Sequence, residues 1–182
     1  MSVVPLTARE SLRVVLVVAT FALVQDTLVL DLRIGTIHPD VMVLLPIMAG
    51  LVGGPATGAS MGFGAGLAAD LFLPTPFGLS ALVGTVVGFA VGAATIALDR
   101  TSWWLPPAVA ILGSAVYELS YASIGSLLGQ PQMLHVDLLR IVVLVSVVNG
   151  ILSLAARRLV AWSLPSASTE GIPTSGVAAA SR

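Results

Sequence analysis

The stretch GLVGGPATGASMGFGAGLAADLFLPTPFG, residues Gly50 to Gly78, has glycine at every fourth position from 50 to 66, and the next step of four reaches Asp70. In a water-soluble helix each glycine costs about 1 kcal/mol relative to alanine. In lipid, small residues four positions apart allow helix backbones to approach closely, and such packing is a main attraction between membrane helices. The stretch therefore predicts closely packed membrane helices.

The composition of the whole chain agrees with a membrane protein. Of the 182 residues, 57% are hydrophobic and 9% are charged, and the mean hydropathy is +1.02, whereas soluble domains carry about 25% charged residues. The net charge of −1 argues against nucleic-acid binding, which requires a basic face. The chain has no cysteine, and its two histidines are far apart in sequence. We therefore expect no disulfide, metal site or other cofactor.

Six apolar segments are separated by turn-forming residues, and each approaches the roughly 20 residues that span a bilayer. We expect an all-α membrane protein with one six-helix transmembrane domain (1–162), followed by a disordered cytoplasmic tail (163–182) that is rich in Ser, Pro, Thr, Ala and Gly. Helices 2 and 3 are short, and the region 39–73 fits either two short spans or a re-entrant hairpin. The expected spans are 13–31, 39–54, 57–73, 78–98, 106–128 and 136–156.

The distribution of arginine predicts the orientation. With six spans and the N-terminus inside, the cytoplasmic side has an excess of arginine, as the positive-inside rule requires. Both chain ends are then cytoplasmic. The inner arginines are Arg9, Arg13, Arg100, Arg157, Arg158 and Arg182, and the outer ones are Arg33 and Arg140.

Two rows of glycine are expected to form packing ridges. The first lies in the third span and the second in the fourth, and they either pack the bundle alone or also receive a partner helix. Gly50 and Gly54 precede Pro55 and need not continue the same face. The ridge residues are Gly58, Gly62, Gly66, Gly84, Gly88 and Gly92.

Four polar residues within the spans are candidate buried sites: Asp70, Glu118, Tyr117 and Asn149. Asp70 is expected near the outer surface, where it either accepts hydrogen bonds from the backbone of the loop Pro76, Phe77 and Gly78 or has a functional role. Glu118 is expected to be the most deeply buried acid, either as a structural side chain or in a polar cavity.

The remaining polar residues have plainer interpretations. Asn149 is expected to form an interhelical hydrogen bond. Gln25 and Asp26 are expected at a solvated edge, and Asp137 with Arg140 is expected to form an i,i+3 pair.

No catalytic arrangement is evident, so an enzyme is not expected. The sequence has no HExxH, no phosphate loop and no Ser-His-Asp set at matching depth. An intramembrane enzyme remains a third, less favoured hypothesis.

The glycine-rich stretch resembles the rod shape-determining protein MreD family of small bacterial inner-membrane proteins. The family pattern g-x-x-x-G-F-x-x-G-L-x-x-D-x-x-x-x-x-x-F-G-x-x-A is matched from Gly58 through Ala81. No basic residue stands beside the turn at 53–55, where family members often carry one, and the first and fifth spans match no family motif. The matching elements are Pro39-Asp40, Gly53-Gly54-Pro55, Gly58, Gly62-Phe63, Gly66-Leu67, Asp70-Leu71 and Pro76-Phe77-Gly78-Leu79.

The resemblance implies a non-catalytic membrane scaffold of the cell-elongation machinery. Such a protein binds MreC and supports lateral peptidoglycan synthesis, together with a SEDS-type glycan polymerase, a class B penicillin-binding protein and MreB. The implied fold is similar to the six-helix substrate-binding subunit of energy-coupling-factor transporters, and the implied location is the bacterial cell membrane, in contact with membrane lipid. The alternative function is that of such a vitamin-binding subunit, which would use Glu118, Asp70 and Tyr117 in an outward-facing cavity.

Overall fold

The computed structural model describes residues 8–31, 40–73, 75–96, 98, 102–131 and 137–164. The predicted tail lies outside these residues from 165 onward, as do His38, His135 and the side chain of Asp26. The predicted all-helical fold with six helices is confirmed. The helices are α1 (Ala8–Asp31), α2 (Leu44–Gly53), α3 (Pro55–Asp70), α4 (Leu79–Ala94), α5 (Leu105–Leu127) and α6 (Leu138–Ser163).

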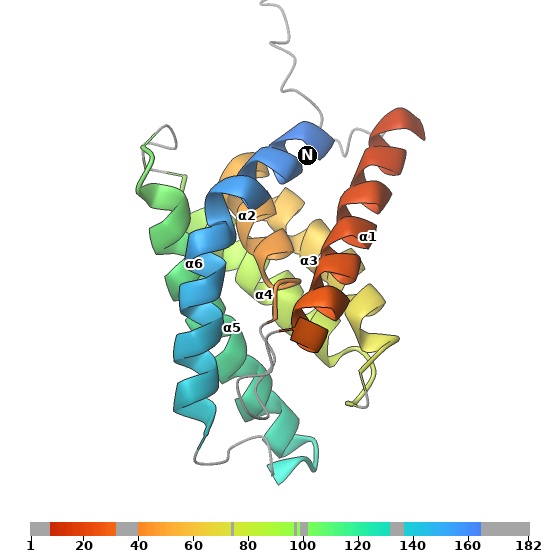
Figure 1. Ribbon diagram of the computed structural model, residues 1–182, viewed down its shortest axis with the longest axis vertical. Helices are drawn as coiled ribbons and strands as arrows, with labels where there is room; N and C mark the ends of the chain where they lie inside the picture. The colour runs from red at the N-terminus through yellow and green to blue at the C-terminus, as the bar shows by residue number, and fades with distance from the viewer. Residues whose placement is uncertain are drawn as a thin grey trace, which may run out of the picture.

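The helices alternate in direction along one long axis (Figure 1). The start of α1 and the end of α6 lie at the same, upper end of the molecule, where the guanidinium carbon of Arg13 is 5.0 Å from the centroid of a Trp162 ring. α3 and α4 form the most extensive helix pair, while α1 packs chiefly against α6. An even number of helices that alternate in direction places the first and the last chain end of the bundle at the same end (Figure 1).

The short helix α2 is the centre of the bundle. Eight of its ten residues are buried, and Leu44, Leu45 and Ile47 are fully enclosed. Ten residues at 1.5 Å each make a helix about 15 Å long, which is half of a roughly 30 Å hydrocarbon core. The predicted span 39–54 is therefore only partly helical, since residues 40–43 precede α2 as an irregular segment inside the bundle.

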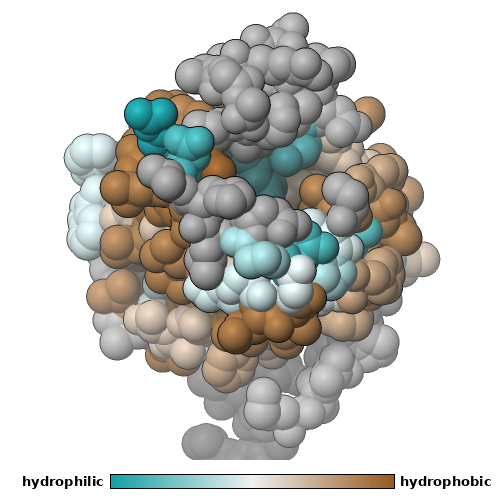
Figure 2. Space-filling view, turned by 90° about the horizontal axis from the view of Figure 1, so that it is seen from below, coloured by the Kyte–Doolittle hydropathy of each residue, from teal (hydrophilic) through white to brown (hydrophobic). Residues whose placement is uncertain are grey.

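The outer surface of the bundle is apolar, and several buried positions are polar. Exposed large side chains recur at helical spacing on α5 at Leu112, Val116 and Leu119. The lower end, viewed in Figure 2, shows hydrophobic residues at the periphery and hydrophilic residues near the middle. α5 and α6 are each long and apolar enough to cross a membrane. This pattern is typical of a helical membrane protein. The buried polar residues are Asp70, Ser80, Thr95, Ser114, Ser146, Asn149, Ser153 and Ser163.

The helix bounds differ from the predicted span bounds, most clearly at the ends of α4 and α6. α6 continues beyond the expected end at 156 to Ser163, because arginine side chains extend their charged heads to water without ending a helix. α4 ends at Ala94 instead of 98, and the next residue, Thr95, donates its hydroxyl to the carbonyl oxygen of Val91 at 2.8 Å.

Candidate functional site: a glycine-packed helix pair and a buried polar network

The glycines of α3 lie directly against the backbone of α4. A Cβ atom on Gly62 would overlap with the carbonyl group of Gly84, and one on Gly58 would overlap with that of Gly88. From the other helix, a Cβ on Gly84 would lie 2.8 Å from the carbonyl oxygen of Gly62. Because the obstructing atoms are backbone, no side-chain rotation relieves the overlap. Only glycine fits at these positions.

The close contact extends over both ends of the pair. A Cβ on Gly66 would overlap with the backbone of Ala81, and one on Gly92 would lie 2.5 Å from the carbonyl carbon of Gly54. All six ridge glycines are buried among the chain's own helices. They pack the bundle, and a partner helix does not reach them in this arrangement.

Gly50 also belongs to this contact, although the break at Pro55 gave no reason to include it. Its Cβ would lie 2.5 Å from the carbonyl oxygen of Gly88. Gly54 has φ of 85°, a left-handed conformation that turns the chain between α2 and α3. Both helices can therefore lie on α4, and the glycine contact spans three helices.

Asp70 caps the N-terminus of α4. Its carboxylate accepts hydrogen bonds from the backbone N–H groups of Gly78 (2.9 Å), Ser80 (3.1 Å) and Ala81 (3.3 Å). These are donors that the first turn of a helix leaves without intrahelical partners, and the helix dipole also favours a negative charge there. The glycine run thus ends on a carboxylate because that carboxylate ties the end of α3 to the start of α4.

Asp70 is more deeply buried than Glu118, although the sequence predicted Glu118 to be the more deeply buried acid. Asp70 is 4% exposed, whereas Glu118 is only partly buried. The Asp70 side chain is enclosed because the loop folds back and brings the start of α4 over its carboxylate. In this loop Gly78 has a positive φ of 94°, and the carbonyl oxygen of Pro76 accepts a hydrogen bond from Leu79 N–H (3.1 Å). The side chain of Phe77 is 66% exposed.

A second polar network surrounds the irregular segment before α2. Asn149 of α6 donates to the carbonyl oxygen of Asp40 (3.0 Å) and to the hydroxyl of Ser114 on α5 (2.9 Å). The side-chain oxygen of Gln25 on α1 accepts a hydrogen bond from Val41 N–H (2.6 Å). Irregular backbone inside a bundle needs such partners, because buried N–H and C=O groups are rarely left unpaired.

Asp40 acts at α2 much as Asp70 acts at α4. Its carboxylate accepts a hydrogen bond from Met42 N–H (3.0 Å) at the start of the turn that leads into α2. Sequence reasoning did not single out Asp40 as a capping residue. Gln25, expected at a solvated edge, is partly exposed and also accepts the hydrogen bond from Val41 N–H. The signal for Asp40 was an aspartate just before a short apolar helix, which is a helix-start signature.

Tyr117 and Tyr121 extend the network along α5. Their rings stack with centroids 6.2 Å apart, and the Tyr121 hydroxyl donates to Thr75 Oγ1 (2.9 Å). Tyr121 thereby links α5 to the loop between α3 and α4. Glu118 lies close enough to Asp40 for their carboxyl groups to interact electrostatically.

Among the described residues, one small crevice borders the polar network. This crevice beside Asp40 and Tyr117 has a volume of about 10 Å³, which is roughly the space of one water molecule. Among the described residues, no three His, Asp or Glu side chains form a metal-binding group. The hydrogen bonds of this network fix the positions of α1, α5 and α6 around the segment before α2.

We expect Asn149→Val to lower the free energy of unfolding by about 1–2 kcal/mol. The change removes both donated hydrogen bonds and leaves the buried Asp40 carbonyl without this partner, and interhelical hydrogen bonds in membranes have about this value. The measurement is SDS-induced unfolding in mixed micelles. Val147→Ala, an exposed change on the same helix, should leave the midpoint within error, and equal effects of the two changes would contradict the assignment.

Comparisons with known protein families, with curated proteins and with solved structures give no match for this chain.

Proposed function

We propose that this chain is a non-catalytic membrane scaffold of the bacterial cell-elongation machinery, similar to MreD. The observation that carries the proposal is that the positions of the family-like pattern form one structural unit, α3, its loop and α4. The buried members supply close packing or cap a helix, as at Gly62, Asp70 and Ala81. Phe63 and Phe77 are exceptions, because they are 54% and 66% exposed.

These two exposed aromatic side chains lie on the surface of the unit that the pattern marks. Phe63 lies on the outer side of α3, and Phe77 lies in the loop before α4. Aromatic side chains are enriched where proteins bind one another. We assign them to the surface that receives the membrane helix of an MreC-like partner, while the glycine contact keeps this surface rigid.

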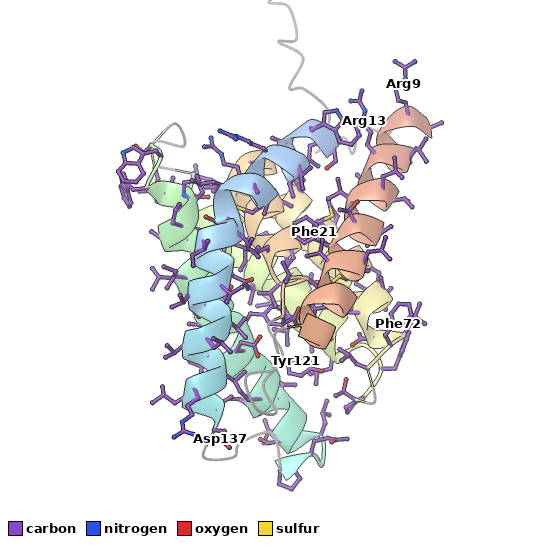
Figure 3. The ribbon with its side chains drawn as sticks, viewed as in Figure 1. Arg9, Arg13, Phe21, Phe72, Tyr121 and Asp137 are labelled. Atoms are coloured by element: carbon purple, nitrogen blue, oxygen red, sulfur yellow. The ribbon has the colours of Figure 1, made fainter. Side chains whose placement is uncertain are left out.

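The proposed setting is the cytoplasmic membrane, crossed six times, with both chain ends in the cytoplasm. Figure 3 shows Arg9 and Arg13 at the upper end of the bundle and Asp137 at the lower end. Arg158 belongs to the last turns of α6, whose end lies at the upper end (Figure 1), and Arg140 pairs with Asp137 at the lower end. This distribution supports the orientation because cytoplasmic loops carry an excess of arginine. From this position the chain would hold MreC near a SEDS-type polymerase, a class B penicillin-binding protein and MreB filaments.

The alternative, a vitamin-binding subunit of an energy-coupling-factor transporter, draws support from the polar groups of Asp40, Tyr117 and Glu118 inside the bundle. The crevice that Asp40 and Tyr117 line has room for roughly one water molecule. A vitamin would require this region to open. The scaffold is therefore the better supported function.

Depletion of the chain in its host cell tests the proposal, which predicts that the cell is rod-shaped. We expect rounded cells of increased width and a loss of lateral wall synthesis, measured with a fluorescent cell-wall precursor. The variant Phe63→Ala/Phe77→Ala should fold normally, lose co-purification with the MreC-like partner and fail to restore cell shape.

The matched control is Leu112→Ala/Leu119→Ala, which changes two exposed side chains on α5 instead. It should restore shape and retain the partner. Unchanged cell width on depletion would refute the elongation role, and a vitamin retained through purification and found by mass spectrometry would favour the transporter subunit.

A further inference from the structure

An apolar groove lies between α1 and α6 and opens to the outside of the bundle. It has a volume of about 150 Å³ and is bounded by Phe21 and Val24 on α1, Leu44 on α2, and Ala155 and Leu159 on α6. Thr20 also borders it, but its hydroxyl donates to the carbonyl oxygen of Leu16 (2.7 Å). The walls therefore present hydrocarbon, and apolar spaces of about 150 Å³ stay dry and accept apolar guests.

A basic and aromatic pair lies above this groove, toward the upper end of α1 and α6. Arg13 stacks on Trp162, with its guanidinium carbon 5.0 Å from a ring centroid. Trp162 follows the groove residue Leu159 by one helical turn. Figure 3 shows Arg13 near the upper end of α1, with Phe21 farther down the same helix.

The length of this arrangement matches one lipid leaflet. From Arg13 to Val24 is eleven residues of helix, or about 16 Å at 1.5 Å per residue. Half of a roughly 30 Å hydrocarbon core is about 15 Å. The groove itself begins at Thr20, seven residues or about 10 Å below Arg13. An acyl chain whose head group lies at Arg13 would therefore run down α1 and enter the groove with its lower part, near the bilayer midplane.

The charge at the upper end favours an anionic head group. Arg9 and Arg158 are exposed near the Arg13–Trp162 pair, one at the start of α1 and the other one turn before Trp162. Basic pockets between membrane helices on the cytoplasmic side bind anionic lipid head groups. The tryptophan ring is suited to the same interfacial depth.

We propose that the groove between α1 and α6 binds one acyl chain of an anionic phospholipid, whose phosphate contacts Arg13. The proposal requires the bundle to lie in a bilayer and does not depend on the elongation role. α1 packs chiefly against α6 and leaves a space beside α2. The lipid fills this space. The bound acyl chain thereby helps to hold α1 in place against the rest of the bundle.

The test uses quenching of Trp162 fluorescence by lipids with brominated acyl chains. The full chain, with Trp103→Phe and Trp104→Phe so that Trp162 alone reports, is placed in vesicles that mix phosphatidylglycerol with phosphatidylcholine. One of the two lipids is brominated in each series. We expect Trp162 to report a roughly fivefold preference for phosphatidylglycerol. This ratio corresponds to about 1 kcal/mol, which is the contribution of one basic residue near an anionic membrane surface.

Two pairs of variants separate the head-group contact from the acyl-chain contact. Arg13→Gln should abolish the preference, while Arg140→Gln at the opposite end should preserve it. Ala155→Phe should fill the groove and abolish site-specific quenching, whereas Ile151→Phe, which is exposed outside the groove, should not.

Equal quenching by the two lipids would overturn the proposal. So would quenching that Ala155→Phe leaves unchanged while it blocks co-purification of a partner, because the groove would then receive a protein helix. Absence of quenching by either lipid would place this end of the bundle outside the bilayer, which would refute the membrane setting itself. A normal preference in a chain whose depletion leaves cell shape unchanged would support the lipid site and refute only the elongation role.

Discussion

Gly62→Leu is expected to unfold most of the protein or to lower its free energy of unfolding by at least about 3 kcal/mol. Overpacking in a core usually costs 1–3 kcal/mol when side chains can shift. Here the new Cβ meets the carbonyl group of Gly84 and the amide nitrogen of Thr85, which are backbone atoms. α3 and α4 would have to separate, and the contact with α2 through Gly50 and Gly88 would weaken as well.

The matched control is Gly64→Leu, two residues along the same helix. A Cβ on Gly64 has no atom within 4 Å, and leucine forms helices better than glycine by most of 1 kcal/mol. Unfolding by SDS in mixed micelles should therefore show unchanged or raised stability for Gly64→Leu and a large loss for Gly62→Leu. Similar midpoints for the two variants would mean that α3 and α4 are not packed at the backbone.

Asp70→Ala is expected to have the second largest effect, a loss of about 2–4 kcal/mol in the free energy of unfolding. Helix caps contribute about 0.5–2 kcal/mol, and a buried donor left without an acceptor costs a further 1–3 kcal/mol. Three N–H groups at the start of α4 lose their shared acceptor in this variant. Amide hydrogen exchange at Gly78, Ser80 and Ala81 should accelerate before exchange elsewhere in α4.

Two further variants distinguish a cap from a functional acid. Asp70→Asn keeps one acceptor oxygen and should lose about half as much stability. Asp137→Ala removes an exposed i,i+3 partner of Arg140 at 3.4 Å and should change stability by no more than about 0.5 kcal/mol. If Asp70→Ala left stability intact but abolished rod shape in cells, the carboxylate would be functional and its capping role secondary.

Much of the architecture follows from local properties of the chain. Apolar segments of helical length, separated by Pro and Gly, predicted six helices, because each helix satisfies its own backbone within one segment. The spacing of Gly58, Gly62 and Gly66 also indicated a close helix contact, because residues four positions apart lie on one face of a helix. The pair Asp137–Arg140 was predicted correctly from its i,i+3 spacing and forms at 3.4 Å.

The misses concern residues whose surroundings come from distant parts of the chain. Gln25 was placed at a solvated edge because it stands near the end of an apolar segment, yet Val41, sixteen residues later, supplies its partner. Gly50 was left out of the ridge because its place depends on the turn at Gly54. Neither relation leaves a periodic signal in the sequence.

The sequence by itself determined the class of protein, the helices and the glycine rows that allow them to touch. The tertiary structure decided which rows meet, how deeply Asp70 lies, and that the segment at Asp40 enters the middle of the bundle to meet Asn149, 109 residues away. The physical reason is that helix formation and spacing are properties of neighbouring residues. Depth and partner choice, by contrast, depend on how all six helices share the limited space around α2.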